Sequence, residues 1–169
     1  VSEKEAIGIY EVVFDDSNKK DKKWYINTNQ SFAFADDTVT ASYGTATPKA
    51  HADTTWTQED LDDLDEVGDL TAGDIKTRGL KYNLIKDLKV NVSNELARTD
   101  WYITRNAEKS TAIPSAISTH RDAVRTKQAS METAITNASN TPALETLYTY
   151  TTTDGVQSRP LGELPILEL

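Results

Sequence analysis

The sequence contains no cysteine, which excludes disulfide bonds, thiolate-bound zinc and a cysteine nucleophile. Apolar residues are also scarce, at 37% of 169 residues, so we expect a modest core and long exposed loops. No apolar run approaches the roughly 20 residues that a membrane-spanning helix needs. The first residues lack the basic and then apolar pattern of a signal peptide. We therefore expect a chain that is made in a cytoplasm and does not bind a membrane.

Positive charge is lacking in the first part of the chain. Residues 1–69 contain 6 Lys and Arg against 16 Asp and Glu, a net charge of −10, whereas residues 70–169 have a net charge of +1. A nucleic-acid interface requires a clustered basic face. We expect no nucleic-acid partner, although the nearly neutral second part is suited to meeting another protein.

The N-terminal third has the pattern of short antiparallel strands. β-branched and aromatic residues fill positions 6–14, and residues 23–27 can form a second strand after a charged turn. Further on, apolar residues alternate with polar ones, a period of two that predicts strands with one buried face. The alternating residues are Phe32, Phe34, Val39, Ala41 and Tyr43, with a turn at Asp36-Asp37. Residues 44–55 show no periodicity and indicate an exposed loop.

The pattern changes to helical after this β-rich part. Residues 56–69 predict a short acidic helix or turn that places its Leu side chains on the sheet and ends at Gly68. Thr71 and Asp74 resemble a capping box, so we expect a helix from Thr71 to Arg98 with a kink at Gly79. Its apolar stripe has spacings of three and four and consists of Ile75, Leu84, Ile85, Leu88, Val92 and Leu96.

A second long helix is expected after a corner. Thr99-Asp100 can end the first helix and begin a short one, and Pro114 suits the first turn of the next. That helix has a heptad-like seam, which can pair with the preceding helix or with a copy of itself. The seam contains Ile117, Val124, Met131 and Ala138, flanked by Ile135 and by a second series of Ile113, His120, Lys127 and Ala134.

These patterns predict an α+β fold. We expect a small antiparallel β unit that is acidic (1–69), a C-terminal helical hairpin (70–150) and an extended tail (151–169). Within the last two, Thr141-Pro142 can open a short helix. Asp154-Gly155 is a turn signal. The apolar residues of the tail are expected to pack on this protein or on a neighbouring subunit.

Residues with catalytic or metal-binding chemistry do not form a pattern in this sequence. The two histidines lack partners at triad or zinc spacing, so we expect His51 to be solvated and His120 to be packed or interfacial. Asp63, Asp65 and Asp74 are a weak candidate for calcium binding, but Val67 falls where that loop needs an oxygen ligand. We expect no enzymatic activity and no cofactor.

Aromatic residues admit two interpretations. Trp24, Tyr25 and Trp56 can form a glycan-binding platform or can anchor a small core, and the core interpretation is favoured. Trp101 and Tyr102 lie at the helical corner, where we expect the Trp101 ring to be buried between the helices. The residues expected to pack or to form an interface are Trp101, Tyr102, Ile113, Ile117, His120, Val124, Met131 and Ile135.

Two motifs in the helical part carry a family resemblance. Residues 96–105 read LARTDWYITR, and Ala-Ile-Pro at 112–114 precedes a helix with HRDAVR at 120–125. This arrangement resembles small tail-associated and tail-fibre assembly proteins of tailed bacteriophages, many from phages of marine bacteria. His120-Arg121 stands where the family more commonly has Tyr-Arg.

The resemblance implies a non-enzymatic protein of the virion tail. It implies an N-terminal β unit that engages a fibre, baseplate or other tail protein, and a helical unit for docking or self-association in a homo-oligomer or multi-subunit assembly. One alternative is a tail-fibre assembly chaperone that does not remain in the virion. Another, from a different class, is a sugar-binding adhesin module.

Overall fold

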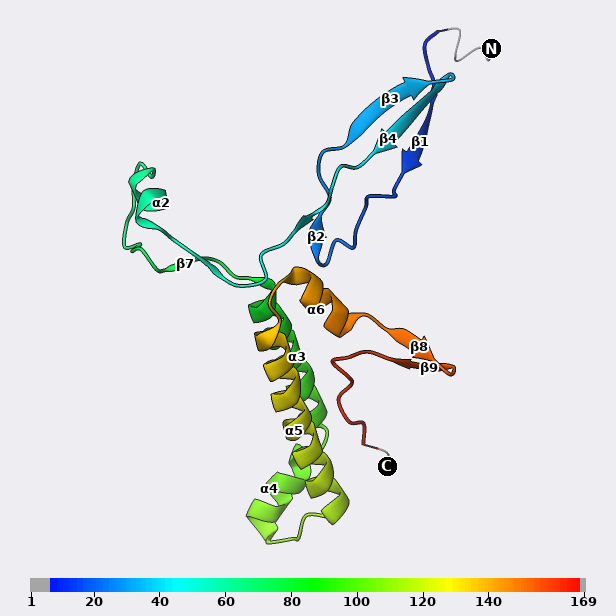
Figure 1. The fold of residues 1–169 in the computed structure, drawn as a ribbon. Helices are drawn as coiled ribbons and strands as arrows, with labels where there is room; N and C mark the ends of the chain where they lie inside the picture. The colour runs from blue at the N-terminus through cyan, green and yellow to red at the C-terminus, as the bar shows by residue number, and fades with distance from the viewer. Residues whose placement is uncertain (1–6, 168–169) are drawn as a thin grey trace. The chain divides into compact units, whose positions relative to one another are not determined.

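A computed structural model describes residues 7–167 and shows an α+β fold, as the sequence predicts (Figure 1). Contacts divide the chain into two compact units, residues 1–49 and 50–169. The sequence placed the division twenty residues later, after residue 69, because the pairing of residues 54–77 was not foreseen. Ala6, at which the first strand was expected to begin, and the last two residues of the expected tail lie outside the described residues.

The first unit contains a three-stranded sheet with the strand order β1-β4-β3. β3 (Ser31–Ala35) and β4 (Thr38–Ser42) are antiparallel, and the Asp36-Asp37 turn between them has φ values of 49° and 58°. Two successive positive φ values are typical of a type I′ hairpin, whose twist matches that of the strands. β1 (Glu11–Asp15) runs parallel to β4, so the expectation of a wholly antiparallel unit is wrong for this strand.

A two-stranded pairing provides the buried part of this unit. β2 (Tyr25–Ile26) pairs with β5 (Thr47–Pro48), and the chain between β1 and β4 passes through β2 before it returns. Trp24 and Tyr25 are only 4% and 3% exposed. The region 44–55, expected to be a loop, therefore contributes two short strands: Thr47 and Pro48 complete the pairing beside these rings, and Thr54–Thr55 forms β6 of the second unit.

The second unit begins with a segment that we call the acidic arm, residues 54–77. β6 (Thr54–Thr55) and β7 (Ile75–Thr77) pair antiparallel and enclose the short helix α2 (Gln58–Asp62). α2 has a capping box, in which the Thr57 hydroxyl accepts from the Asp60 amide and the Asp60 carboxylate accepts from the Thr57 amide. The acidic helix is confirmed, but it ends at Asp62 and not at Gly68, and it belongs to this arm, where its Leu61 is buried.

The expectation of a helix from Thr71 is wrong. The Asp74 carboxylate accepts from both the amide and the hydroxyl of Thr71, at 2.7 and 2.9 Å, in a tight turn, and Ile75 lies in β7. The helix α3 (Leu80–Ala97) instead begins after Gly79, whose amide donates to the Asp53 carboxylate at 2.7 Å. A β-carbon at Gly79 would overlap the Ala52 carbonyl, so the backbone needs glycine here at the start of the helix and not as a kink.

The arm has a pH-dependent contact. Lys76 holds the pKa of Asp60 at about 2, helped by the Thr57 amide and hydroxyl. This folded pKa is below the usual value of 3.8, so ionised Asp60 stabilises the arm. The stabilisation is fully present above pH 3.8 and is lost as the pH falls through about 2. In an NMR titration from pH 5 to about 1.5, the Thr57 and Lys76 amide signals should shift with Asp60. Asp60→Asn should abolish this step and Asp65→Asn should retain it; an unchanged step in Asp60→Asn would contradict the assignment.

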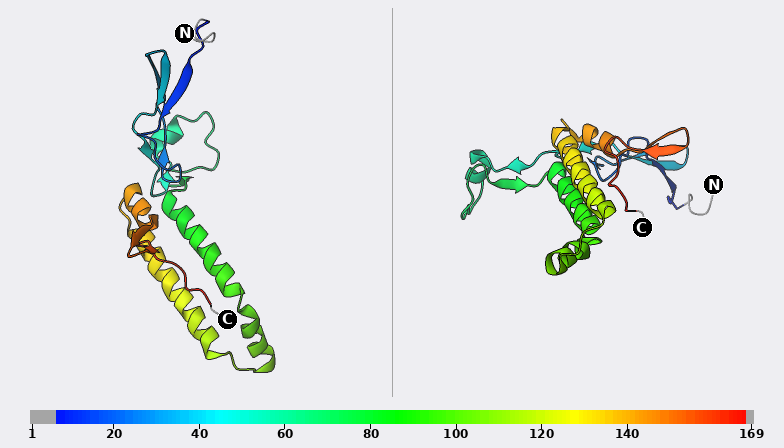
Figure 2. Two further views of the ribbon diagram at one scale, coloured as in Figure 1. Left: turned by 90° about the vertical axis from the view of Figure 1, so that its right-hand side faces the viewer. Right: turned by 90° about the horizontal axis from the view of Figure 1, so that it is seen from below.

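The helical hairpin forms within the chain. α3 and α5 (Ser115–Asn137) lie side by side and antiparallel, and α4 (Asp100–Lys109) forms the corner between them (Figures 1 and 2). Both sides of the interface follow the predicted spacing. The buried residues on the predicted series are Leu84, Leu88 and Val92 of α3 and Ile117, His120, Val124, Met131, Ile135 and Ala138 of α5 and its end; Arg121 of α5 is buried in addition. Of the two pairings that the sequence left open, the seam therefore pairs with α3.

The chain after the hairpin returns to it. α6 (Thr141–Tyr148) begins at Asn140, whose side chain accepts from the Ala143 amide at 2.9 Å, and it buries Leu144. The hairpin of β8 (Thr151–Thr153) and β9 (Val156–Ser158) turns at Asp154-Gly155, as predicted.

The expected extended tail is thus partly a β-hairpin. Beyond it, Leu161 is 3% exposed and its amide donates to the Leu147 carbonyl at 3.0 Å. The guanidinium of Arg159 lies over the rings of Tyr148 and Tyr150, 5.3 and 5.2 Å from the centroids. This part of the tail packs on its own chain.

Candidate interaction surface and helical joint

Strand pairing places six apolar residues on one face of the first unit's sheet. Val12 of β1 pairs with Val39 of β4, which pairs with Phe34 of β3; in the same way Phe14 pairs with Ala41 and Ala41 with Phe32. Paired residues on neighbouring strands point to the same side of a sheet. We call this set the apolar sheet face: Val12, Phe14, Phe32, Phe34, Val39 and Ala41.

The apolar sheet face is largely exposed. Phe14, Phe32 and Phe34 are 65%, 66% and 58% exposed, whereas Ala41 is fully buried. The Phe34 ring contacts Tyr10, with 4.5 Å between the ring centroids. The alternation predicted from the sequence is confirmed, but the predicted burial of this face is wrong, because no second layer of residues 7–49 covers it. Exposed apolar surface of this kind marks a site of interaction with another protein or a ligand.

The open edges of the sheet add a second way to bind. β1 and β3 are the outer strands in the order β1-β4-β3, so each has one side without a partner strand in the sheet. Unpaired backbone N–H and C=O groups on such edges are able to accept an added strand. The same small sheet therefore presents both apolar side chains and backbone hydrogen-bonding groups.

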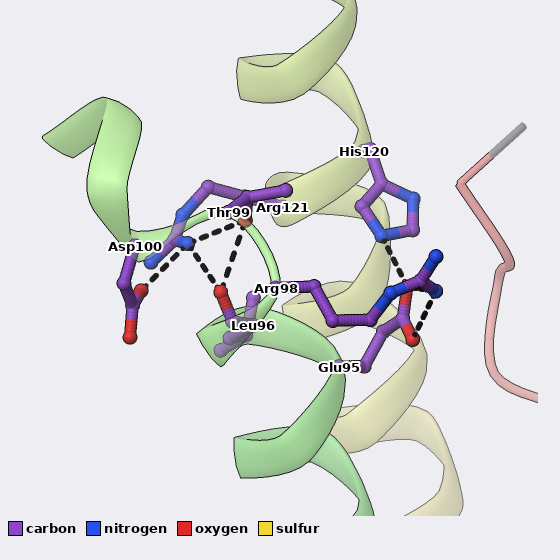
Figure 3. Close-up of polar contacts among 7 residues, drawn as sticks. All are labelled: Glu95, Leu96, Arg98, Thr99, Asp100, His120 and Arg121. Atoms are coloured by element: carbon purple, nitrogen blue, oxygen red, sulfur yellow. Dashed lines mark hydrogen bonds and ion pairs between the residues drawn. The ribbon is translucent and has the colours of Figure 1, made fainter. Parts of the chain in front are cut away.

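The corner of the helical hairpin is held by a buried arginine. One terminal nitrogen of Arg121 donates to the Leu96 carbonyl, the Thr99 hydroxyl and the Asp100 carboxylate at 2.8, 2.7 and 2.8 Å (Figure 3). Thr99 is 1% exposed and also donates its hydroxyl to the Leu96 carbonyl at 3.0 Å. The positive charge of Arg121 thus meets the carbonyl end of α3, where the helix dipole favours a cation.

A second polar contact lies one residue before Arg121. His120 Nε2 lies 3.0 Å from Glu95 Oε1, and Arg98 donates to both oxygens of Glu95 at 3.0 Å (Figure 3). Burial raises the pKa of the Glu95 carboxyl, but the hydrogen bond and charge of Arg98, together with His120, outweigh this effect and leave the pKa below its usual value. The Arg121 contacts link α5 to the end of α3 and the start of α4, and the His120–Glu95 contact links α5 to α3.

The expectation that Trp101 fills this corner is wrong. Its side chain is 53% exposed and contacts Tyr102 and Arg105 on its own helix, with 4.6 Å between the two aromatic centroids. Arg121, which the sequence did not single out, takes the buried place. Tyr102 and Ile113 are half-buried, whereas Ile117, His120, Val124, Met131 and Ile135 are buried as expected.

The three residues of the expected glycan platform are not presented together. Trp24 and Tyr25 are buried, and lysine side chains lie over their rings, Lys23 at 4.6 Å and Lys20 at 4.5 Å from the centroids. Trp56 belongs to the other unit and is half-buried beneath Lys76. The buried pair therefore serves as core, in agreement with the favoured interpretation.

The candidate metal ligands are not brought together either. Asp74 is engaged by Thr71, and no group of three His, Cys, Asp or Glu residues among residues 7–167 is arranged to hold a metal ion. His51, expected to be solvated, is half-buried. Within the same range, no helix has the length and apolar character to cross a membrane.

Comparisons with models of known families, with curated proteins and with solved structures gave no match. The resemblance to phage tail proteins therefore remains an expectation that rests on the residues quoted for it.

Proposed function

We propose that this chain is a non-enzymatic structural component of a bacteriophage tail, retained in the virion, which binds another tail protein through its N-terminal sheet. The observation that carries the proposal is the exposure of the apolar sheet face. A folded β unit that leaves three Phe side chains more than half exposed is completed by a partner that covers them.

The packing of the second unit also supports the proposal. Its hairpin packs its own seam and fixes its own corner through Arg121, so this unit is stably folded without using the apolar sheet face. A self-sufficient helical unit joined to an incomplete β unit suits a connector between assembled components. The identity of the assembly as a phage tail comes from the sequence resemblance.

The test measures how well variants on each face of the sheet are incorporated into purified virions. We expect mass spectrometry to find the protein in particles at a fixed copy number, and the Phe32→Ser/Phe34→Ser variant to be lost from them. The matched control is Val13→Ser, which removes an exposed apolar side chain (47%) from the opposite face and should be incorporated normally.

Three results would count against the proposal or change it. Absence from particles that require the protein for infectivity would replace it by the transient assembly chaperone. Normal incorporation of the double variant would show that the apolar sheet face is not the binding surface. If the protein is absent from particles and is also not required for infectivity, a tail function is contradicted altogether.

A further inference from the structure

A groove with basic and apolar side chains lies on α3. It has a volume of about 490 Å³ and is lined by Tyr82, Ile85, Lys86, Lys89, Val90 and Ser93; we call it the α3 groove. At 100° per residue, these positions centre on the side of the helix away from Leu84, Leu88 and Val92, which are buried in the hairpin seam. The groove is therefore an outer surface of the hairpin.

The α3 groove combines exposed apolar surface with positive charge. Tyr82 and Val90 are 43% and 51% exposed, and Lys86 and Lys89 lie between them in the sequence. At the N-terminal end of the groove, the guanidinium of Arg78 lies 4.2 Å from the centroid of the Tyr82 ring, and its charge is paired with the Asp53 carboxylate. Such a surface is suited to an acidic segment that also has apolar side chains.

The chain contains such a segment in its own acidic arm. Leu64 and Leu70 are 36% and 39% exposed there, within a stretch that has no Lys or Arg from position 58 to position 70. The acidic residues of this stretch are Glu59, Asp60, Asp62, Asp63, Asp65, Glu66 and Asp69. Its charge and its exposed leucines match the composition of the α3 groove.

We propose that the acidic arm of one copy binds in the α3 groove of a second copy, and that the exchange is reciprocal. A reciprocal contact uses both arms and both grooves, so it closes as a two-fold dimer and leaves no unpaired groove. This inference concerns self-association and does not depend on the proposed tail function or on the apolar sheet face.

The contact is assigned between copies because the arm leaves its own groove open. Among residues 7–167, every residue that lines the groove belongs to α3. The base of the arm is also fixed, since Asp53 binds the Gly79 amide and the Arg78 guanidinium at 2.7 Å each. The close approach of Gly79 to Ala52 further restricts bending at this point.

The first experiment is sedimentation of the full chain across concentration and salt. We expect a dimer that dissociates as NaCl rises from 0.05 to 0.5 M, because screening weakens contacts between charges. Lys86→Glu/Lys89→Glu should weaken dimerisation by about tenfold or more. The matched control Arg105→Glu/Lys109→Glu makes the same charge change on α4 and should dimerise as the unaltered chain does.

A charge exchange makes the test specific. The arm variant Asp65→Lys/Glu66→Lys should also dimerise more weakly alone. Mixed with Lys86→Glu/Lys89→Glu, it should form a heterodimer, because the two introduced lysines of one arm then face the two introduced glutamates of the other chain's groove. Circular dichroism of each variant should match the unaltered chain, so that loss of dimer is not loss of fold.

Each other outcome overturns the proposal. A chain that is monomeric at about 100 μM, a concentration well above a micromolar Kd, would exclude the exchange of arms between copies. A dimer that resists Lys86→Glu/Lys89→Glu would mean that the contact is elsewhere. Failure of the two weakened variants to form a heterodimer would exclude pairing of the arm with the groove.

Discussion

Replacing Arg121 by Ala is expected to lower the free energy of unfolding of the helical unit by about 2–3 kcal/mol. The side chain is 9% exposed, and its removal takes away three hydrogen bonds at the corner of the hairpin. The Thr99 hydroxyl retains the Leu96 carbonyl as a partner, and the Asp100 carboxylate is 59% exposed to water. The effect is therefore smaller than for a fully buried ion pair.

Arg125 is the matched control because it lies one turn later on the same helix. Its side chain is 52% exposed and meets Asp122 at 3.5 Å, a surface pair of little value. Arg125→Ala should change the free energy of unfolding by less than about 0.5 kcal/mol. Urea denaturation followed by circular dichroism at 222 nm compares the two variants. Equal effects would show that Arg121 does not hold the joint.

Replacing Ile135 by Ala is expected to cost about 2–5 kcal/mol in the free energy of unfolding. Ile135 is fully buried near the end of α5, so the substitution removes buried methyl and methylene groups and leaves a cavity. The residue lies beside the heptad seam that packs against α3.

Ile103 provides the control for this change. It has the same side chain, lies on α4 and is 40% exposed, so Ile103→Ala should cost less than about 1 kcal/mol. The two variants are compared by urea denaturation at one protein concentration, because any self-association would shift the midpoint with concentration. A small effect at Ile135 would contradict its place in the core of the hairpin.

Predictions from the sequence were most accurate for features that depend on residues close together along the chain. The seven-residue spacing of Ile117, Val124 and Met131 predicted one face of α5, and that face is buried. Turns were equally local, since Asp36-Asp37 and Asp154-Gly155 adopt the positive φ values that their residue types favour. Asn140, which lies just before the predicted start of α6, caps the helix itself.

Predictions were wrong where distant residues competed with a local signal. Thr71 and Asp74 have the residues of a helix start, but Ile75–Thr77 pairs with Thr54–Thr55, and this pairing delays the helix to Leu80. Trp101 was expected in the corner because of its size. The Arg121 guanidinium instead donates to the Leu96 carbonyl, the Thr99 hydroxyl and the Asp100 carboxylate together, whereas an indole ring has a single N–H donor.

The sequence by itself determined the α+β class, the helical hairpin, its seam and most of the turns, because each of these depends on spacing along the chain. Only the tertiary structure decided which faces are covered. Nothing in the alternation of Phe32, Phe34, Val39 and Ala41 reveals that the expected second layer is missing from residues 7–49, since alternation reports a difference between two faces and not what lies against either. For the same reason, neither binding surface could be found from the sequence alone. The strand register defines the apolar sheet face, and the packing of α3 on α5 defines which side of α3 carries the groove.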